Sequence, residues 1–332
     1  MDKDKWLHTR SQETGELSYI SVAILGLCNL DCEFCYVGGS REGIWQVKEL
    51  INIINEVRDF GLQKIELTGG EPLLYPELPR LLEYLTGVHL DILTVTNGTV
   101  IDEENSELFA RHKVTIGVSL ESIDEKISDE MANVKGSHKQ RLQGIELLKR
   151  AGYGQPEGLP FYAIMATLKK NLPTYIETWK WAKEQGMVPI IDRSIPSSRC
   201  KIDSIITGSE LRTLLDQIGE IEGEYQRMPF IHNEGCNRTS TGVHIDIDGS
   251  VYPCSGVPLY LGNAKTDGLT RIWTESVELD VCRQIEKYIK EPCQTCEEHS
   301  SCSGCRGIAY AVTGDITAGD PLCWKNKDGF SD

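Results

Sequence analysis

The sequence predicts an α/β fold, a partial (β/α)6 barrel followed by a small cysteine-rich α+β domain. Two observations lead to this prediction. Between residues 18 and 192, short apolar segments alternate with longer amphipathic ones in six strand–helix units. The cysteines also form two groups, three before residue 36 and eight after residue 235, with only Cys200 between them. The chain therefore divides into two modules, each with its own cysteine chemistry.

The first module is predicted from the order of its elements. Strands are expected at residues 19–25, 64–67, 90–96, 114–120, 161–168 and 188–192. Helices are expected between them at residues 44–60, 77–85, 103–112, 141–151 and 174–185. Strict alternation of strand and helix predicts parallel strands joined by helical crossovers. In a barrel of this kind, the chemistry lies on the loops that follow the strands.

The second module is predicted to contain short strands and turns. A polar amphipathic helix at residues 208–226 leads into it, and strands at 243–247 and 251–253 flank the turn Asp248-Gly249 as a hairpin. Apolar runs are scarce there, so bound metal is expected to contribute folding free energy. The predicted boundaries are an N-terminal segment (1–17), the barrel (18–205), a linker (206–235) and the cysteine-rich domain (236–332).

Composition narrows the class of protein. The 332 residues carry a formal net charge of −16, which disfavours binding to nucleic acid. The sequence contains neither a signal peptide nor an apolar run of about 18 residues, so we expect a cytoplasmic protein that does not enter the membrane. Twelve cysteines in a reducing compartment indicate metal or redox chemistry, not disulfides.

The first cysteine group lies directly after the first expected strand. Cys28, Cys32 and Cys35 have the spacing CxxxCxxC, which can place three thiolates on three corners of an iron–sulfur cubane. The fourth iron would then lack a protein ligand, and an open coordination position is typical of catalytic metal centres. The alternatives are a zinc site with a distant fourth ligand, or three unconnected thiols.

This loop resembles that of the radical S-adenosylmethionine (SAM) superfamily, whose core is a partial barrel. Three further segments are similar to family motifs at the ends of strands two, three and four: Thr68–Gly69–Gly70–Glu71–Pro72, Thr96–Asn97–Gly98 and Val118–Ser119–Leu120–Glu121. The resemblance implies that Cys28, Cys32 and Cys35 hold a [4Fe–4S] cluster whose open iron binds SAM. It also implies that SAM is contacted by Phe34, Gly69, Gly70, Glu71, Pro72, Asn97, Ser119, Glu121 and Ile190.

One position departs from the family pattern. Relatives with the C-terminal module often carry an arginine after strand four that pairs with the SAM carboxylate. Met131 stands there in this sequence, and Lys135 is the nearby cation. Lysine lacks the bidentate fork of arginine, so the sequence leaves the carboxylate partner open.

The second cysteine group resembles the SPASM extension, which binds two auxiliary iron–sulfur clusters, and the resemblance implies clusters of the [4Fe–4S] type. The resemblance assigns Cys293, Cys296, Cys302 and Cys323 to an outer cluster, and Cys236, Cys254 and Cys305 to an inner one. Structural zinc is the alternative, because zinc ribbons also use Cys-x2-Cys pairs. Two cubanes need one thiolate more than these seven, so the inner cluster has an open iron, a non-cysteine ligand, or Cys200 or Cys282. A catalytic role for Cys200, as a hydrogen-atom donor, is the other hypothesis for that residue.

The resemblance implies reductive cleavage of SAM to a 5′-deoxyadenosyl radical that abstracts hydrogen from a substrate C–H bond. Electrons would come from a flavodoxin or ferredoxin. The expected setting is maturation of a ribosomal peptide or peptide-derived cofactor, with a separate leader-binding protein because few residues precede the first strand. The alternative is a small molecule, through tetrapyrrole decarboxylation or oxidation or epimerisation of an aminocyclitol or nucleoside. A zinc-stabilised binding module without catalysis is the third hypothesis.

Overall fold

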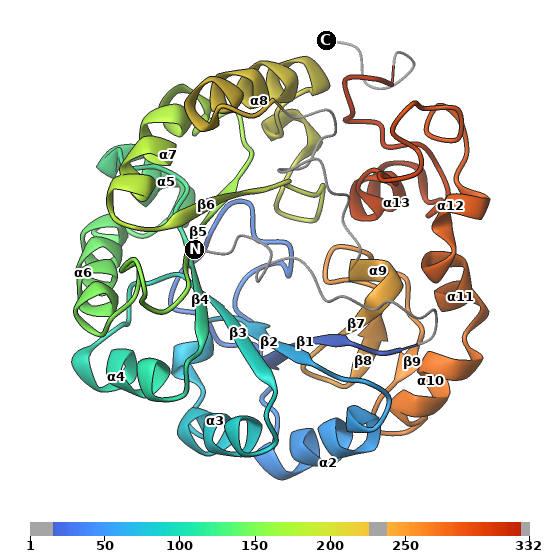
Figure 1. Cartoon of the computed structure of the whole chain (residues 1–332), viewed down its shortest axis with the longest axis horizontal. Coiled ribbons are helices and arrows are strands. Elements are labelled where there is room, and N and C mark those ends of the chain that lie inside the picture. The colour runs from blue at the N-terminus through green and yellow to red at the C-terminus, as the bar shows by residue number, and fades with distance from the viewer. Residues whose placement is uncertain (1–15, 226–237, 327–332) are drawn as a thin grey trace.

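The computed structural model describes residues 16–225 and 238–326. Over these residues the helices form a ring around the strands (Figure 1). The chain runs round this ring once, from β1 through α8 to the C-terminal helices, which lie between α8 and α2. The N-terminal and C-terminal halves therefore close one ring instead of forming two separate globules.

Six parallel strands form the N-terminal half, as predicted. They are β1 (Tyr19–Leu25), β2 (Lys64–Gly69), β3 (Asp91–Thr96), β4 (Thr115–Ser119), β5 (Phe161–Ala166) and β6 (Val188–Asp192). The sheet order runs from β6 to β1 with β6 at an edge, which gives an open barrel. The crossover helices are α2 (Val47–Arg58), α3 (Leu78–Gly87), α4 (Glu103–Arg111), α5 (Glu125–Ala132), α6 (Ser137–Arg150) and α7 (Tyr175–Glu184). Helix α5 and the first turn of α6 are additions to the predicted elements.

The two faces of the sheet have different partners. Ile20, Leu67 and Ile116 point outward and pack with helix residues in the main apolar core. Alternate positions point inward, where Leu93, Tyr162, Ile164 and Ile190 form a separate cluster made of strand residues alone. The inner face therefore surrounds the centre of the ring.

The C-terminal half begins with α8 (Gly208–Glu222), which a Thr207–Glu210 capping box starts and Gly223 ends. The predicted hairpin is confirmed by β7 (Gly242–Ile245) and β8 (Ser250–Tyr252), which pair antiparallel. Strand β9 (Gly262–Asn263) follows.

The expectation that only short strands and turns follow residue 236 is wrong. The structure adds five helices: α9 (Arg238–Thr241), α10 (Leu269–Glu275), α11 (Val277–Arg283), α12 (Ile285–Tyr288) and α13 (Arg306–Thr313). Each has four to eight residues, which is too short for apolar periodicity to distinguish a helix from a turn.

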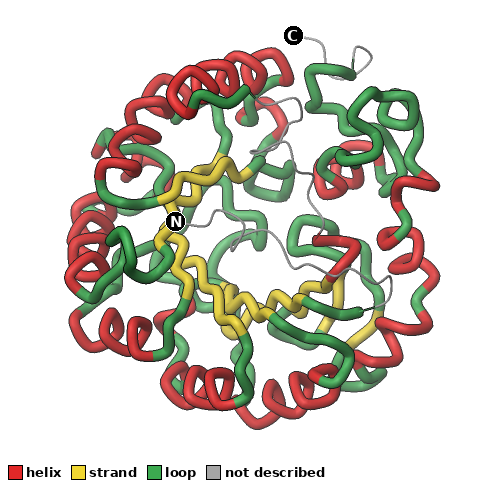
Figure 2. Tube along the Cα trace, in the orientation of Figure 1, coloured by secondary structure: helices red, strands yellow, loops and turns green. Residues whose placement is uncertain are grey.

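One sheet joins the two halves. Strand β7 pairs parallel with β1, so the order continues as β2-β1-β7-β8-β9 (Figure 2). The buried His244 of β7 hydrogen-bonds Ser21 of β1 (3.2 Å). The C-terminal half is thus attached to the barrel along the strand that precedes the first cysteine loop.

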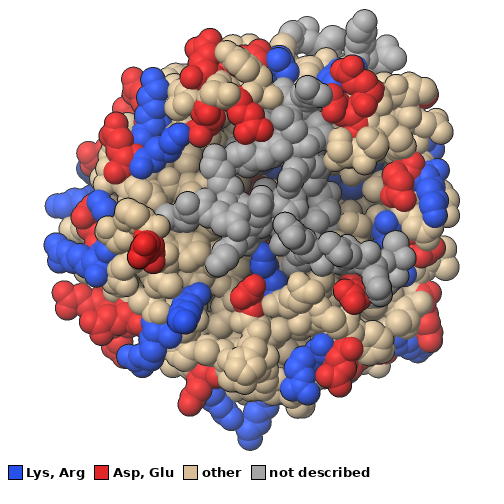
Figure 3. Space-filling model, in the orientation of Figure 1, with Lys and Arg blue, Asp and Glu red and all other residues tan. Residues whose placement is uncertain are grey.

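Acidic and basic side chains are interspersed around the rim of the face in Figure 3. The net charge of −16 is therefore not gathered in one patch on that face. Among the described helices, none has both the length and the apolar character needed to cross a membrane.

Candidate active site

The segments predicted to bind SAM lie at one edge of the sheet. Cys28 follows the end of β1 by three residues, and Gly69, Asn97 and Ser119 lie at or next to the ends of β2, β3 and β4. Because these strands are parallel, their carboxyl ends meet at the same edge. The structure therefore brings together four motifs that are up to about 90 residues apart in the chain.

Backbone contacts from the end of β2 brace the first cysteine loop. The amides of Gly70 and Glu71 donate to the carbonyls of Leu25 and Leu27, each at 2.9 Å. A side chain at position 70 would place its Cβ 2.0 Å from the Leu27 carbonyl oxygen, so only glycine allows this approach. The two-glycine motif was expected to approach a ligand; the contact seen here is with the loop that precedes Cys28.

Glu71 ties β2 to β3. Its buried carboxylate accepts hydrogen bonds from the Thr96 hydroxyl (2.7 Å), the Asn97 amide (2.8 Å) and the Leu73 amide (3.2 Å). Burial raises the pKa of Glu71, and these hydrogen bonds oppose that shift. Oε1 already accepts two hydrogen bonds, whereas Oε2 accepts one and can accept one more. The predicted contact with SAM stays a prediction.

The three thiols of the first cysteine group lie on one short loop and influence one another electrostatically. Burial raises the pKa values of Cys28 and Cys32, and Cys35 raises both further through its charge. The Asn97 side-chain amide donates to Cys28 Sγ at 3.9 Å. Three cysteines on one loop fit an iron–sulfur centre, because the positive charge of iron stabilises the thiolates against burial and against their mutual repulsion.

Four C-terminal cysteines surround one cavity. It has a volume of about 420 Å³, and its lining includes Cys293, Cys296, Cys302 and Cys323. All four are present as thiols. These are the residues predicted to hold the outer auxiliary cluster, and their arrangement fits such a group. No three His, Cys, Asp or Glu side chains within the described ranges converge tightly enough for a single metal ion.

Comparison with known proteins identifies the class. Residues 22–165 match the radical SAM superfamily, and residues 236–297 match SPASM, an iron–sulfur cluster-binding domain. This protein is a radical SAM enzyme with a SPASM domain. Iron–sulfur clusters and SAM are therefore its cofactors.

Similar proteins cover nearly the whole chain. The AdoMet-dependent heme synthase of Methanosarcina barkeri is 26% identical and aligns over 89% of this chain and 93% of its own length. The PqqA peptide cyclase of Granulibacter bethesdensis is 24% identical over 89% of this chain and 84% of its own length.

Solved structures share the fold at low sequence identity. Streptococcus suis SuiB bound to precursor peptide SuiA is 18% identical with a TM-score of 0.74, covering 94% of this chain and 76% of that one. The enzyme anSMEcpe with bound AdoMet and a Cp18Cys peptide is 18% identical with a TM-score of 0.71, covering 92% and 93%.

The inner face of the radical SAM domain carries the remaining predicted contacts. In the strand register Ser119 lies beside Ile164, and Ile164 lies beside Ile190. Asp192 is on the same face, two residues beyond Ile190, and sequence reasoning missed it. Its side chain is open to solvent, but the protein packed around it raises the pKa to about 6 against the opposing charge of Arg238.

A buried arginine, which the sequence analysis treated as the first residue of a helix, lies below the Asn97 turn. Arg141 Nε donates to the Asn97 carbonyl (3.0 Å) and Nη1 to the Ser128 hydroxyl (2.6 Å). Burial raises the pKa of Glu121, and the charge of Arg141 opposes that shift. The sequence placed Met131 and Lys135 in the region where relatives carry the arginine that pairs with the SAM carboxylate. Met131 is fully buried and Lys135 is exposed. Arg141 is therefore the buried cation of this region.

A small apolar cluster joins the radical SAM domain to the SPASM domain. Cys200 is 1% exposed and packs in this cluster, which includes Met131 and the α13 residue Ile308, with Phe34 and Cys305 against it. The predicted roles of Phe34 with SAM and of Cys200 as ligand or hydrogen-atom donor stay predictions. Cys236, predicted for the inner cluster, lies outside the described residues.

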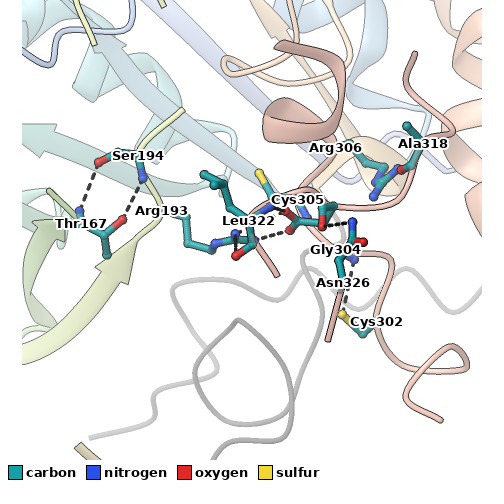
Figure 4. A network of polar contacts seen from close by, with 11 residues as sticks. Thr167, Arg193, Ser194, Cys302, Gly304, Cys305, Arg306, Ala318, Leu322 and Asn326 are labelled. Carbon is teal, nitrogen blue, oxygen red and sulfur yellow. Dashed lines mark hydrogen bonds and ion pairs between the residues drawn. The ribbon is translucent and has the colours of Figure 1, made fainter. Parts of the chain in front are cut away.

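A buried carboxylate links the end of β6 to the cluster segments (Figure 4). Asp320, which is fully buried, forms an ion pair with Arg193. It also accepts from the amides of Cys305 (2.8 Å) and Leu322 (3.0 Å). Arg193 Nη2 donates to the Leu322 carbonyl (3.2 Å). The position of Cys305 is thus coupled to the mouth of the barrel.

Proposed function

We propose that the protein holds a SAM-binding [4Fe–4S] cluster on Cys28, Cys32 and Cys35 and abstracts hydrogen from a peptide C–H bond. The observation that carries this proposal is that one short loop places three cysteines at the strand edge where the other SAM motifs end. When bound there, the cluster and SAM supply a 5′-deoxyadenosyl radical.

The residues of the chain position these groups. Gly70 and Glu71 fix the cysteine loop through backbone hydrogen bonds, and Asn97 faces Cys28. Ser119 and Ile190 line the inner face on which SAM would extend. The open carboxylate of Asp192 is the polar group of that face best placed to meet substrate or SAM.

Two auxiliary [4Fe–4S] clusters complete the proposed enzyme. The cavity lined by Cys293, Cys296, Cys302 and Cys323 supports the outer one. The inner one would use Cys254 and Cys305, with Cys236. Electrons would come from a flavodoxin or ferredoxin and pass to or from the substrate radical through these clusters.

The similarity to PqqA peptide cyclase supports a peptide substrate, in ribosomal peptide or peptide-derived cofactor maturation. A separate leader-binding protein is part of this proposal. The alignment with AdoMet-dependent heme synthase over 93% of its length favours a second candidate, a tetrapyrrole.

The test uses the full chain, reconstituted without oxygen and reduced in the presence of SAM. We expect release of 5′-deoxyadenosine and about 12 irons per chain. Mass spectrometry then compares a precursor peptide encoded beside the gene with a tetrapyrrole carrying propionates. A mass change in the peptide supports the first candidate, and loss of carboxyl groups from the tetrapyrrole supports the second. Absence of 5′-deoxyadenosine would refute both.

A further inference from the structure

The first cysteine loop is closed at its base by backbone pairing. Residues 41–45 run antiparallel to the end of β1. The amide of Arg41 donates to the carbonyl of Gly26 (2.8 Å), and the amide of Gly26 donates to the carbonyl of Gly43 (2.9 Å). All three thiols of the first cysteine group lie between these paired segments. The position of residues 41–45 therefore limits where the thiols can lie.

Ser40 connects this paired base to the first cysteine. Its side-chain oxygen accepts a hydrogen bond from the Cys28 amide at 3.1 Å. Because Ser40 directly precedes Arg41, a shift of Arg41 would move this acceptor. The backbone of Cys28 is thereby joined to Arg41 through a single residue.

The SPASM domain holds Arg41 from another side. Asp246 directly follows β7, in the turn between β7 and β8. Nη1 and Nη2 of Arg41 donate to its two carboxylate oxygens at 2.9 and 2.8 Å, so the contact is bidentate. Burial acts to raise the pKa of Asp246, but the hydrogen bonds from Arg41 oppose it and hold the pKa below its usual value. The two side chains are therefore an ion pair at neutral pH.

Two further contacts place the same turn on the base of the loop. The Trp45 indole donates to the Asp246 carbonyl at 3.2 Å. A Cβ at Gly43 would lie 2.9 Å from the Ile247 side chain, and the φ of +122° at Gly43 favours glycine in any case. The turn thus packs on residues 43–45 as well as pairing with Arg41.

The other printed ion pairs of the loop have a different origin. Lys170, after β5, pairs with Glu33 at 2.7 Å. Arg199, after β6, pairs with Asp31. Both partners come from the far side of the barrel sheet, whereas Asp246 adds a contact from the SPASM domain.

We infer that Asp246 is a positioning residue for the SAM-binding cluster: it holds Arg41, and through residues 40–45 it fixes the backbone of Cys28. This inference rests on the proposed cluster of the first cysteine group. Without the bidentate contact the base of the loop can shift, and a displacement of about 1 Å at a reacting centre can cost up to about 100-fold in rate. The SPASM domain would then contribute to SAM cleavage itself.

The experiment compares the wild-type chain with Asp246→Asn, Arg41→Met and the double variant, and uses Asp248→Asn as the matched control. Asp248 lies in the same turn and is exposed, and its carboxylate accepts from Ser250 within that turn. The Arg41–Asp246 pair is partly exposed, so the variants should fold.

Three measurements are made on each protein. After reconstitution without oxygen, iron is counted and the release of 5′-deoxyadenosine is measured at saturating SAM. Electron–nuclear double resonance with SAM labelled by nitrogen-15 in its amino group reports on the SAM-binding cluster alone. Hydrogen exchange of residues 40–45 in the metal-free chain tests the contact without any cluster.

We expect the rate to fall about tenfold in each single variant and no further in the double variant, because both substitutions remove the same contact. The nitrogen coupling should broaden while iron stays at about 12 per chain, and Asp248→Asn should match the wild type. A wild-type rate and coupling in Asp246→Asn would overturn the inference, as would an equal loss in Asp248→Asn or losses that multiply in the double variant.

Hydrogen exchange separates failure of this inference from failure of the proposed function. Residues 40–45 should exchange faster in metal-free Asp246→Asn than in metal-free Asp248→Asn. Equal exchange in the two variants would overturn the inference while leaving the proposed function intact. A wild-type chain that takes up no iron would refute the proposed function, and with it the cluster on which the inference rests.

Discussion

The two cysteine regions of this enzyme are built in different ways. In the radical SAM domain the three thiols share one loop, and hydrogen bonds from the backbone just after β2 and from the Asn97 side chain after β3 hold that loop. In the SPASM domain the thiols come from segments spread over residues 254–323, short helices connect them, and four of them surround a cavity. We infer that the first region exists before its cluster binds, whereas the second depends on its clusters for stability.

The largest expected effect is on catalysis in the first region. Cys35→Ala should abolish release of 5′-deoxyadenosine, measured by chromatography after reduction with SAM. Because the loop is braced without the cluster, hydrogen exchange of α2 to α7 should match that of the wild type. Widespread loss of protection in those helices would show that the first cluster is structural as well, and would remove the contrast.

The second region should respond in the opposite way. Cys302→Ala removes one proposed ligand from the 420 Å³ cavity, and we expect iron to fall from about 12 to about 8 per chain. Hydrogen exchange should accelerate in α12 and α13 but not in α2 to α7. Unchanged protection throughout the SPASM domain, together with loss of iron, would contradict its dependence on clusters.

The ion pair between the two regions offers a smaller test. Arg193→Met leaves Asp320 buried without its cation, which should cost about 3–5 kcal/mol of stability. Lys290→Ala is the control, because its pair with Asp315 is on the surface and should contribute at most about 1 kcal/mol. Denaturant unfolding of the cluster-loaded proteins measures both. Equal losses in the two variants would show that burial of the Arg193–Asp320 pair is unimportant.

The smallest effect concerns Asp192 and pH. The protein packed around the Asp192 side chain raises its pKa to about 6 in the folded protein, above the usual value near 3.9 in an unfolded chain. The unfolded state therefore ionises first, and this group lowers stability as pH rises from about 4 to about 6. Asp192→Asn should raise the melting temperature relative to wild type at pH 8 and change it little at pH 4. A shift of the same size at both pH values would exclude titration as the cause.

Sequence reasoning worked where the pattern is local in the chain. The six strands were predicted because buried parallel strands form apolar runs bounded by turns, and CxxxCxxC places three thiols in one loop whatever surrounds it. The helices α10 to α13 were missed because each is too short to show a period. Arg141 was missed because nothing in its local sequence shows that it is buried beneath the Asn97 turn. Asp192 was missed because nothing in its local sequence shows that it lies on the inner face of the sheet.

The sequence by itself determined the alternation of elements, the loop of three thiols and the presence of two cysteine modules. These depend on spacing along the chain, which folding does not change. Tertiary structure alone decided that β7 extends the barrel sheet and that Asp320 joins the two domains. Contacts between distant segments depend on how the helices and strands pack, and no local pattern records that packing.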